Sequence, residues 1–164
     1  MKQIILLTII LIIGCNDNSV ASTQETDSWI FVANEGALNE SNGSISMIDE
    51  FGNIYKMDNI GDVVQSLEVY NNQLIVLING DHMIKIYDIT ENGLTFNREI
   101  STNNSSPREL VVENNKVYFT NWNSQDVKVL NLLDDSIESI SVPGLPEGII
   151  INENSLWVTI PNLD

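Results

Sequence analysis

The chain has 164 residues, with 23 acidic and only 7 basic side chains and a formal net charge of −16. Such a charge repels phosphate backbones, so nucleic acid is excluded as a partner. One histidine and one cysteine exclude an intramolecular disulfide, a cysteine metal cluster and a multi-histidine metal site within these residues.

Residues 1–14 are predicted to form a lipoprotein signal peptide. The apolar run Ile4–Ile13 follows one basic residue and is too short to span a bilayer. Ile12-Ile13-Gly14-Cys15 resembles a bacterial lipobox, so Cys15 is the expected lipidation site. The alternative is an ordinary cleaved signal with an incidental cysteine. Several acyl chains, at ~0.8 kcal/mol per buried methylene, would be the only expected attachment to a membrane.

Residues 15–28 are predicted to be a flexible tether, because they are almost entirely polar. Asn16, and not an aspartate, follows the cysteine. By resemblance to enteric lipoproteins, this argues against retention in the inner membrane. We therefore expect a lipid-anchored protein of the cell envelope, on the outer membrane.

Residues 29–164 are predicted to be all-β. No apolar stripe recurs at helical spacing, whereas β-branched and aromatic runs alternate with polar turns. The expected strands include, in chain order, Trp29–Ala33, Ser44–Ile48, Asn53–Met57, a strand beginning at Val64, Gln73–Ile78, Leu110–Glu113, Lys116–Thr120, Asp126–Leu130, Ile137–Val142 and Ser155–Thr159. The tryptophans Trp29 and Trp157 lie on strands and are expected in the core.

A repeat of about forty residues with four strands each is typical of a β-propeller blade. Leu67, Leu110 and Ile149 form one column of this repeat, and Asn34, Asn79 and Asn121 form a second. The predicted blades are 29–62, 63–104, 105–143 and an incomplete 144–164, about three and a third blades in all. Because propellers close with four to eight blades, we expect the sequence to be part of a longer protein.

The stretch "PRELVVENNKVYFTNWNSQDVKVLNL" resembles the repeat of the YVTN-type, surface-layer-like β-propellers, with Phe119-Thr120-Asn121 at the family's Val-Thr-Asn. "FVANEGALNESNGSISMID" and "GDVVQSLEVYNNQLIVLING" are similar to the lipoprotein branch of that family in Bacteroidetes. The resemblance implies a seven-bladed ring of which this chain is the N-terminal part.

The search for catalytic, metal-binding and cofactor-binding residues identifies none. His82 lies in a loop and is interpreted as a surface residue rather than an acid–base group. Ser105-Ser106 lacks a nucleophile-elbow pattern, and no phosphate-binding glycine loop is present. Asp134-Asp135 lacks the alternating oxygen ligands of a calcium loop and is interpreted as a tight turn.

The longer loops are expected on one face of the propeller, where binding residues preferentially sit. The candidate ligand-binding residues on these loops are Asn34, Glu35, Asn79, Asp81, Asn121 and Trp122. The alternative for the asparagines is that they close Asx turns. The alternative for Trp122 is that it covers a junction between blades.

The sequence therefore predicts a non-catalytic binding module, with a small molecule or an outer-membrane transporter as partner. The family resemblance implies a nutrient of the cobalamin type, delivered to that transporter. One alternative is a protein–protein interaction scaffold at the cell surface. Another is a propeller hydrolase or quinone-dependent dehydrogenase whose active residues lie in blades beyond this sequence.

Overall fold

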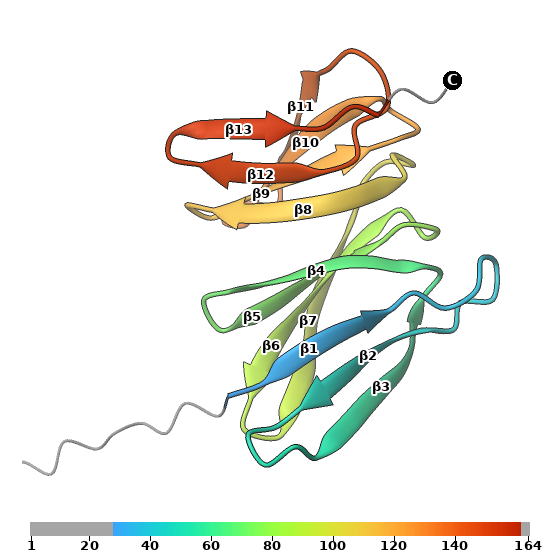
Figure 1. The fold of residues 1–164 in the computed structure, drawn as a ribbon, viewed down its shortest axis with the longest axis vertical. Coiled ribbons are helices and arrows are strands. Elements are labelled where there is room, and N and C mark those ends of the chain that lie inside the picture. The colour runs from blue at the N-terminus through green and yellow to red at the C-terminus, as the bar shows by residue number, and fades with distance from the viewer. Residues whose placement is uncertain (1–27, 162–164) are drawn as a thin grey trace, which may run out of the picture.

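The computed structural model describes residues 28–161, which form thirteen β-strands and no helix. The strands make four antiparallel sheets, and the strand order within each sheet follows the chain. Figure 1 shows the sheets succeeding one another from β1 to β13. The all-β prediction is confirmed. The predicted signal peptide, Cys15 and the tether up to residue 27 lie outside the described residues.

The sheets contain three, four, four and two strands. The first comprises β1 (Ile30–Asn34), β2 (Gly43–Ile48) and β3 (Ile54–Gly61). The second comprises β4 (Val64–Tyr70), β5 (Gln73–Ile78), β6 (Met83–Thr90) and β7 (Gly93–Ser101). The third comprises β8 (Pro107–Glu113), β9 (Lys116–Asn121), β10 (Asp126–Asn131) and β11 (Ile137–Ser141). The fourth comprises β12 (Ile149–Asn152) and β13 (Ser155–Val158).

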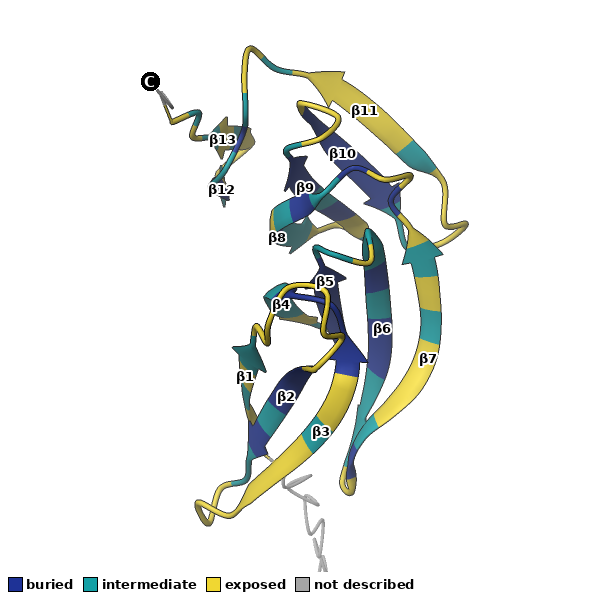
Figure 2. Ribbon diagram, turned by 90° about the vertical axis from the view of Figure 1, so that its right-hand side faces the viewer, coloured by how far each residue is buried: buried dark blue, intermediate teal, exposed yellow. Residues whose placement is uncertain are grey.

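The sheets pack face to face, and their first strands lie along one side of the arc (Figure 2). β4 contacts both β1 and β8, and β8 contacts β12. The last strands β3, β7 and β11 lie on the opposite side and carry much of the exposed surface (Figure 2). No described segment forms a helix that could cross a membrane.

Two apolar clusters hold the first three sheets together. Successive side chains of a strand point to opposite faces, so Leu74 and Val76 pack against the first sheet while Ile75 and Leu77 pack against the third. We call the face that packs on the preceding sheet the trailing face, and the face that packs on the following sheet the leading face. β5 is apolar at almost every position because both of its faces are covered.

The two strand tryptophans differ from each other. Trp29 packs against the first apolar cluster, as expected. Trp157 is 60% exposed among the described residues. It lies on the leading face of the fourth sheet, and no described residues form a sheet beyond that face. Its expected place in the core is therefore not met within residues 28–161.

Candidate functional site

The loops predicted to carry the site lie at one end of the sheets and are hydrogen bonded to the links between sheets. Asn39, in the β1–β2 loop, donates its N–H to Oδ1 of Asp62 (2.8 Å). Gly80, in the β5–β6 loop, donates to the carbonyl of Asp62 (2.9 Å), and Asn123, after β9, donates to that of Ser105 (3.0 Å). This end of the molecule is thus a connected surface.

Asn34 and Asn121 make equivalent bonds within their own sheets. Each donates its side-chain amide to the carbonyl two residues earlier and to the carbonyl of its strand partner, at 3.0–3.4 Å. Asn34 also donates to Ser46, and the Oδ1 of Asn121 accepts from Ser105 Oγ (2.6 Å). Asn121 is fully buried. These bonds hold both side chains within their own sheets, although none of them is the Oδ1···H–N bond of an Asx turn, and their ligand-binding role stays a prediction.

Asn79 does not share the column of the other two asparagines, contrary to the sequence interpretation. Strand pairing matches Ile78 with Val64 and Asn121 with Pro107, so Asn79 lies one position later in the repeat. Its amide donates across to the third sheet, to the carbonyl of Pro107 (2.8 Å) and to Ser106 Oγ (3.1 Å). Asn79 therefore joins two sheets.

Glu35 and Asp81 are the exposed members of the predicted set. The Asp81 carboxylate accepts the N–H of Asp62 (3.0 Å), which fixes its position beside the link between the first and second sheets. The Glu35 carboxylate makes no hydrogen bond or ion pair with the described residues, while its backbone carbonyl accepts the N–H of Val64 (3.0 Å). Both carboxylates thus present negative charge on the loop end.

Trp122 is half-buried and lies under the side chain of Arg108. The guanidinium carbon is 4.3 Å from the centre of the indole, which is a cation–π contact. The indole Nε1–H is buried and has no hydrogen-bond partner among the described residues. A buried donor without an acceptor is costly, and Trp29 Nε1 is in the same state, so the missing partner does not by itself mark a binding site.

Arg108 joins the second and third sheets to the segment that leads into the fourth, at the same end of the molecule. Its Nη2 lies 2.8 Å from Glu147 Oε1, in an ion pair that Nε also contacts at 3.2 Å, and its Nη1 donates to Gln65 Oε1 (2.9 Å). We call Gln65, Arg108, Glu147 and Trp122 the polar seam. Gln65 and Arg108 both lie where the pairing of the first two strands of their sheets shifts, and such bulges re-aim side chains.

The polar seam was not predicted from the sequence, although a signal existed. Gln65, Arg108 and Glu147 each stand two residues before a member of the Leu67 column. Three long polar side chains at one repeat position on neighbouring strands are expected to meet. Of the six predicted residues, only Trp122 belongs to this group.

Asp126, where β10 begins, holds a second polar cluster near this end. Its carboxylate accepts bonds from Lys128 Nζ (2.8 Å), Ser139 Oγ (2.7 Å) and Ser124. Burial alone would raise the pKa of this carboxyl, but the Lys128 ammonium and the two serine hydroxyls lower it below its ordinary value. The cluster keeps a buried charge satisfied and leaves little capacity for a ligand.

His82 is a link between sheets rather than a free surface residue. Its Nδ1 accepts the N–H of Ser106 (3.1 Å), and its carbonyl accepts from Thr102 (2.9 Å). The Asp134-Asp135 segment is a tight turn, as predicted, in which Asp134 accepts the N–H of Ser136 (3.0 Å). Within residues 28–161, no group of three or more His, Cys, Asp or Glu side chains is arranged to hold a metal.

Comparison with known proteins agrees with the propeller architecture. No family model matches the chain, and no curated protein matches its sequence. Similar solved structures include a luciferin-regenerating enzyme (11% identity, TM-score 0.62), covering 75% of this chain and 45% of that one. Virginiamycin B lyase from Staphylococcus aureus in its quinupristin complex is 19% identical with a TM-score of 0.59, over 80% and 53% of the two chains.

The β-propeller domain of Cps50 (Swd1) from Myceliophteria thermophila is 12% identical with a TM-score of 0.59, over 75% of this chain and 46% of that domain. This chain has a β-propeller fold. It spans about half the length of the structures that it matches. At these identities the likeness concerns the fold alone, and membership of the YVTN branch remains a proposal.

Proposed function

We propose that this chain is a non-catalytic binding module of the cell envelope, anchored by a lipid on Cys15. Its propeller holds a small polar or ring-bearing ligand at the loop end, for presentation to an outer-membrane transporter. The observation that carries this proposal is the polar seam, in which two sheets, the link to the fourth sheet and an indole supply side chains to one place.

The seam has properties that suit recognition. Arg108 is fixed by a bidentate carboxylate pair and by the indole, so little side-chain freedom remains to be lost when a ligand binds. The half-buried indole of Trp122 offers a surface for stacking. The ligand would be polar and would carry a flat ring.

Cyanocobalamin is the first probe to test, because the family resemblance suggests it. Stacking on an aromatic side chain contributes about 1–3 kcal/mol, so Trp122→Ala should weaken binding roughly ten- to hundredfold. Isothermal titration of the full chain in detergent would measure this loss, with Phe51→Ala as the control at an exposed aromatic residue of the β2–β3 turn. If the unaltered chain does not bind cyanocobalamin, cobalamin is ruled out as the ligand. If Trp122→Ala binds as tightly as the unaltered chain, the proposed site at Trp122 is ruled out.

The anchor has its own test. Cys15→Ala should abolish fatty-acid labelling and move the protein from the membrane fraction to the soluble fraction, because no acyl acceptor remains. Labelling that persists in this variant would contradict lipidation. Neither result depends on which ligand binds.

A further inference from the structure

We propose that a cavity between the first and second sheets, at the end of the molecule opposite the loops, binds a small quaternary ammonium ion. Its lining includes Trp29 and Tyr55 from the first sheet and Glu91 from the second. The cavity and the polar seam lie at opposite ends of the sheets. The site therefore does not depend on the ligand proposed for the loop end.

The cavity has a volume of about 150 Å³ and lies between two neighbouring sheets. Tyr55 lies on β3, and Glu91 lies in the turn between β6 and β7, at the same end as the β2–β3 turn (Figure 1). Trp29 packs against the first apolar cluster, and Tyr55 is the cross-strand partner of Met47 in that cluster. Both rings therefore lie on the leading face of the first sheet, toward the second.

Aromatic rings supply one part of the lining. The ring centres of Trp29 and Tyr55 are 5.7 Å apart, and their planes are inclined by 70°. The Tyr55 hydroxyl donates to Asp49 Oδ2 (3.3 Å), which orients the phenol. Phe51, in the β2–β3 turn, adds a third ring. Aromatic faces carry partial negative charge, so they attract a cation within ~6 Å of the ring centre, and indole attracts it most strongly.

Carboxylates supply the rest of the charge. Asp49, Glu50 and Glu91 line the cavity, and no basic side chain does. The carboxylates of Glu50 and Glu91 make no hydrogen bond or ion pair with the described residues, so the chain leaves their charge uncompensated. The formal net charge of −16 also attracts cations.

A methylated ammonium ion fits this lining because it is a cation with an apolar surface, which suits aromatic rings and carboxylates together. The lipid head group phosphocholine has the same ammonium but brings a phosphate beside the carboxylates, where like charges repel. We therefore expect the free ion, such as choline, to bind more tightly than the head group.

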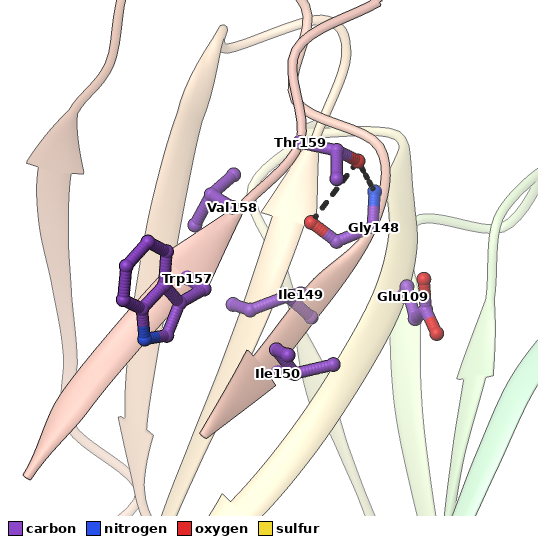
Figure 3. Close-up of a pocket in the computed structure, with 7 residues that line it drawn as sticks. All are labelled: Glu109, Gly148, Ile149, Ile150, Trp157, Val158 and Thr159. Carbon is purple, nitrogen blue, oxygen red and sulfur yellow. Dashed lines mark hydrogen bonds between the residues drawn. The ribbon is translucent and has the colours of Figure 1, made fainter. Parts of the chain in front are cut away.

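The pocket on the fourth sheet provides an internal comparison. It has a volume of about 360 Å³ and contains one aromatic ring, Trp157, and one carboxylate, Glu109, among mainly aliphatic residues (Figure 3). It lacks the combination of several rings with several carboxylates. Trp157 therefore reports contact of a cation with an exposed indole outside the proposed site.

NMR titration of the isotope-labelled full chain in a non-ionic detergent tests the site, because each of the three tryptophans gives one indole N–H signal. Choline should shift the Trp29 signal saturably and leave those of Trp122 and Trp157 in place, with Trp29→Phe assigning the first. The neutral analogue with carbon in place of the charged nitrogen should bind roughly tenfold more weakly. Glycerophosphocholine should also bind more weakly than choline.

Two variants test the two parts of the lining. Glu91→Gln removes a carboxylate and Tyr55→Leu removes a ring, and each should weaken choline binding about three- to tenfold. Both side chains are exposed, so the melting temperature should change little. Glu40→Gln removes an exposed carboxylate at the loop end and is the matched control, with unchanged affinity expected.

A Trp29 signal that does not move with choline would overturn the site. Equal affinity for choline and its neutral analogue would overturn recognition of a cation. Tighter binding of glycerophosphocholine would assign the cavity to a lipid head group and overturn the free ion as ligand. Unchanged choline affinity in both Glu91→Gln and Tyr55→Leu would show that the ion binds elsewhere.

Discussion

The second and fourth sheets show how one repeat unit behaves with and without neighbours on both sides. In the second sheet, the residues from Leu74 to Ile78 are all fully buried, because a sheet covers each face. In the fourth sheet, Ile149 is buried and the next residue, Ile150, is largely exposed. Burial in this molecule is thus decided by what lies on each face rather than by the strand sequence.

The largest expected loss of stability comes from replacing a buried phenylalanine, and an exposed phenylalanine serves as its comparison. Phe119 is fully buried in the second cluster, so Phe119→Ala should cost about 3–5 kcal/mol of unfolding free energy. Phe51→Ala, at an exposed turn, should change stability by less than ~0.5 kcal/mol. Urea unfolding followed by circular dichroism measures both, and similar losses would refute the distinction.

The second largest loss concerns a charge in the third sheet. Asp126→Asn leaves the ammonium of Lys128 without its ion pair, so we expect a loss of about 2–3 kcal/mol at pH 7. The exposed Lys56–Asp58 pair is the control, and Asp58→Asn should cost under ~1 kcal/mol. Equal effects would show that burial adds nothing to the Asp126 pair.

The same carboxylate should make stability depend on pH. Because the pKa of Asp126 is lowered in the folded state from 3.8, its contribution is present above that pH and is lost as the pH falls through the folded pKa. Between pH 7 and pH 2 the melting temperature should therefore fall less steeply for Asp126→Asn than for the unaltered chain. Parallel curves would contradict this assignment.

A smaller effect tests the two faces directly. Val76 and Val32 both belong to trailing faces, but Val76 is fully buried and Val32 is 41% exposed. Val76→Ala should cost about 2 kcal/mol and Val32→Ala less than ~1 kcal/mol, since only the first leaves a cavity. If Val32→Ala cost as much as Val76→Ala, Val32 would have to pack against a further segment of the protein, which its exposure argues against.

The smallest expected effect is on the seam that joins the interior sheets to the fourth. Arg108→Lys keeps the charge but loses the bidentate pair and the bond to Gln65, so about 1 kcal/mol should be lost. Arg98→Lys, at an exposed ion pair with Asp135, should cost less. Denaturant melts of both variants make the comparison, and a larger loss for Arg98→Lys would contradict it.

The strands and their repeat were predictable because alternation and turn residues are local signals. The Leu67 column is correct, since Leu67, Leu110 and Ile149 pair with equivalent residues of the next strand. The second column failed at Asn79, because a shared residue type does not reveal hydrogen-bond register. Asn79 follows its strand, whereas Asn121 ends its own.

The site was less predictable than the fold. Arg108 meets Gln65 and Glu147 only because strand bulges and the packing of neighbouring sheets direct them to one place, and neither is a local property. The exposure of Trp157 among the described residues has a related cause, since an apolar strand residue is core only when another sheet covers its face. Alternation in the sequence shows which face of a sheet a side chain lies on, but not whether another sheet packs against that face.

The consecutive strand order has a consequence for how the protein acquires its structure. Within each sheet every strand pairs with its neighbour in the chain, so most early contacts close short loops. Each sheet can therefore form as a hairpin series before distant segments exist, and the next sheet then consolidates on its leading face. Arrays whose units contact their neighbours in the chain can fold by nucleation and propagation, and the sheets here make such contacts. An intermediate in which one sheet has formed and the next has not would expose an apolar face. Such intermediates would carry the greatest risk of aggregation.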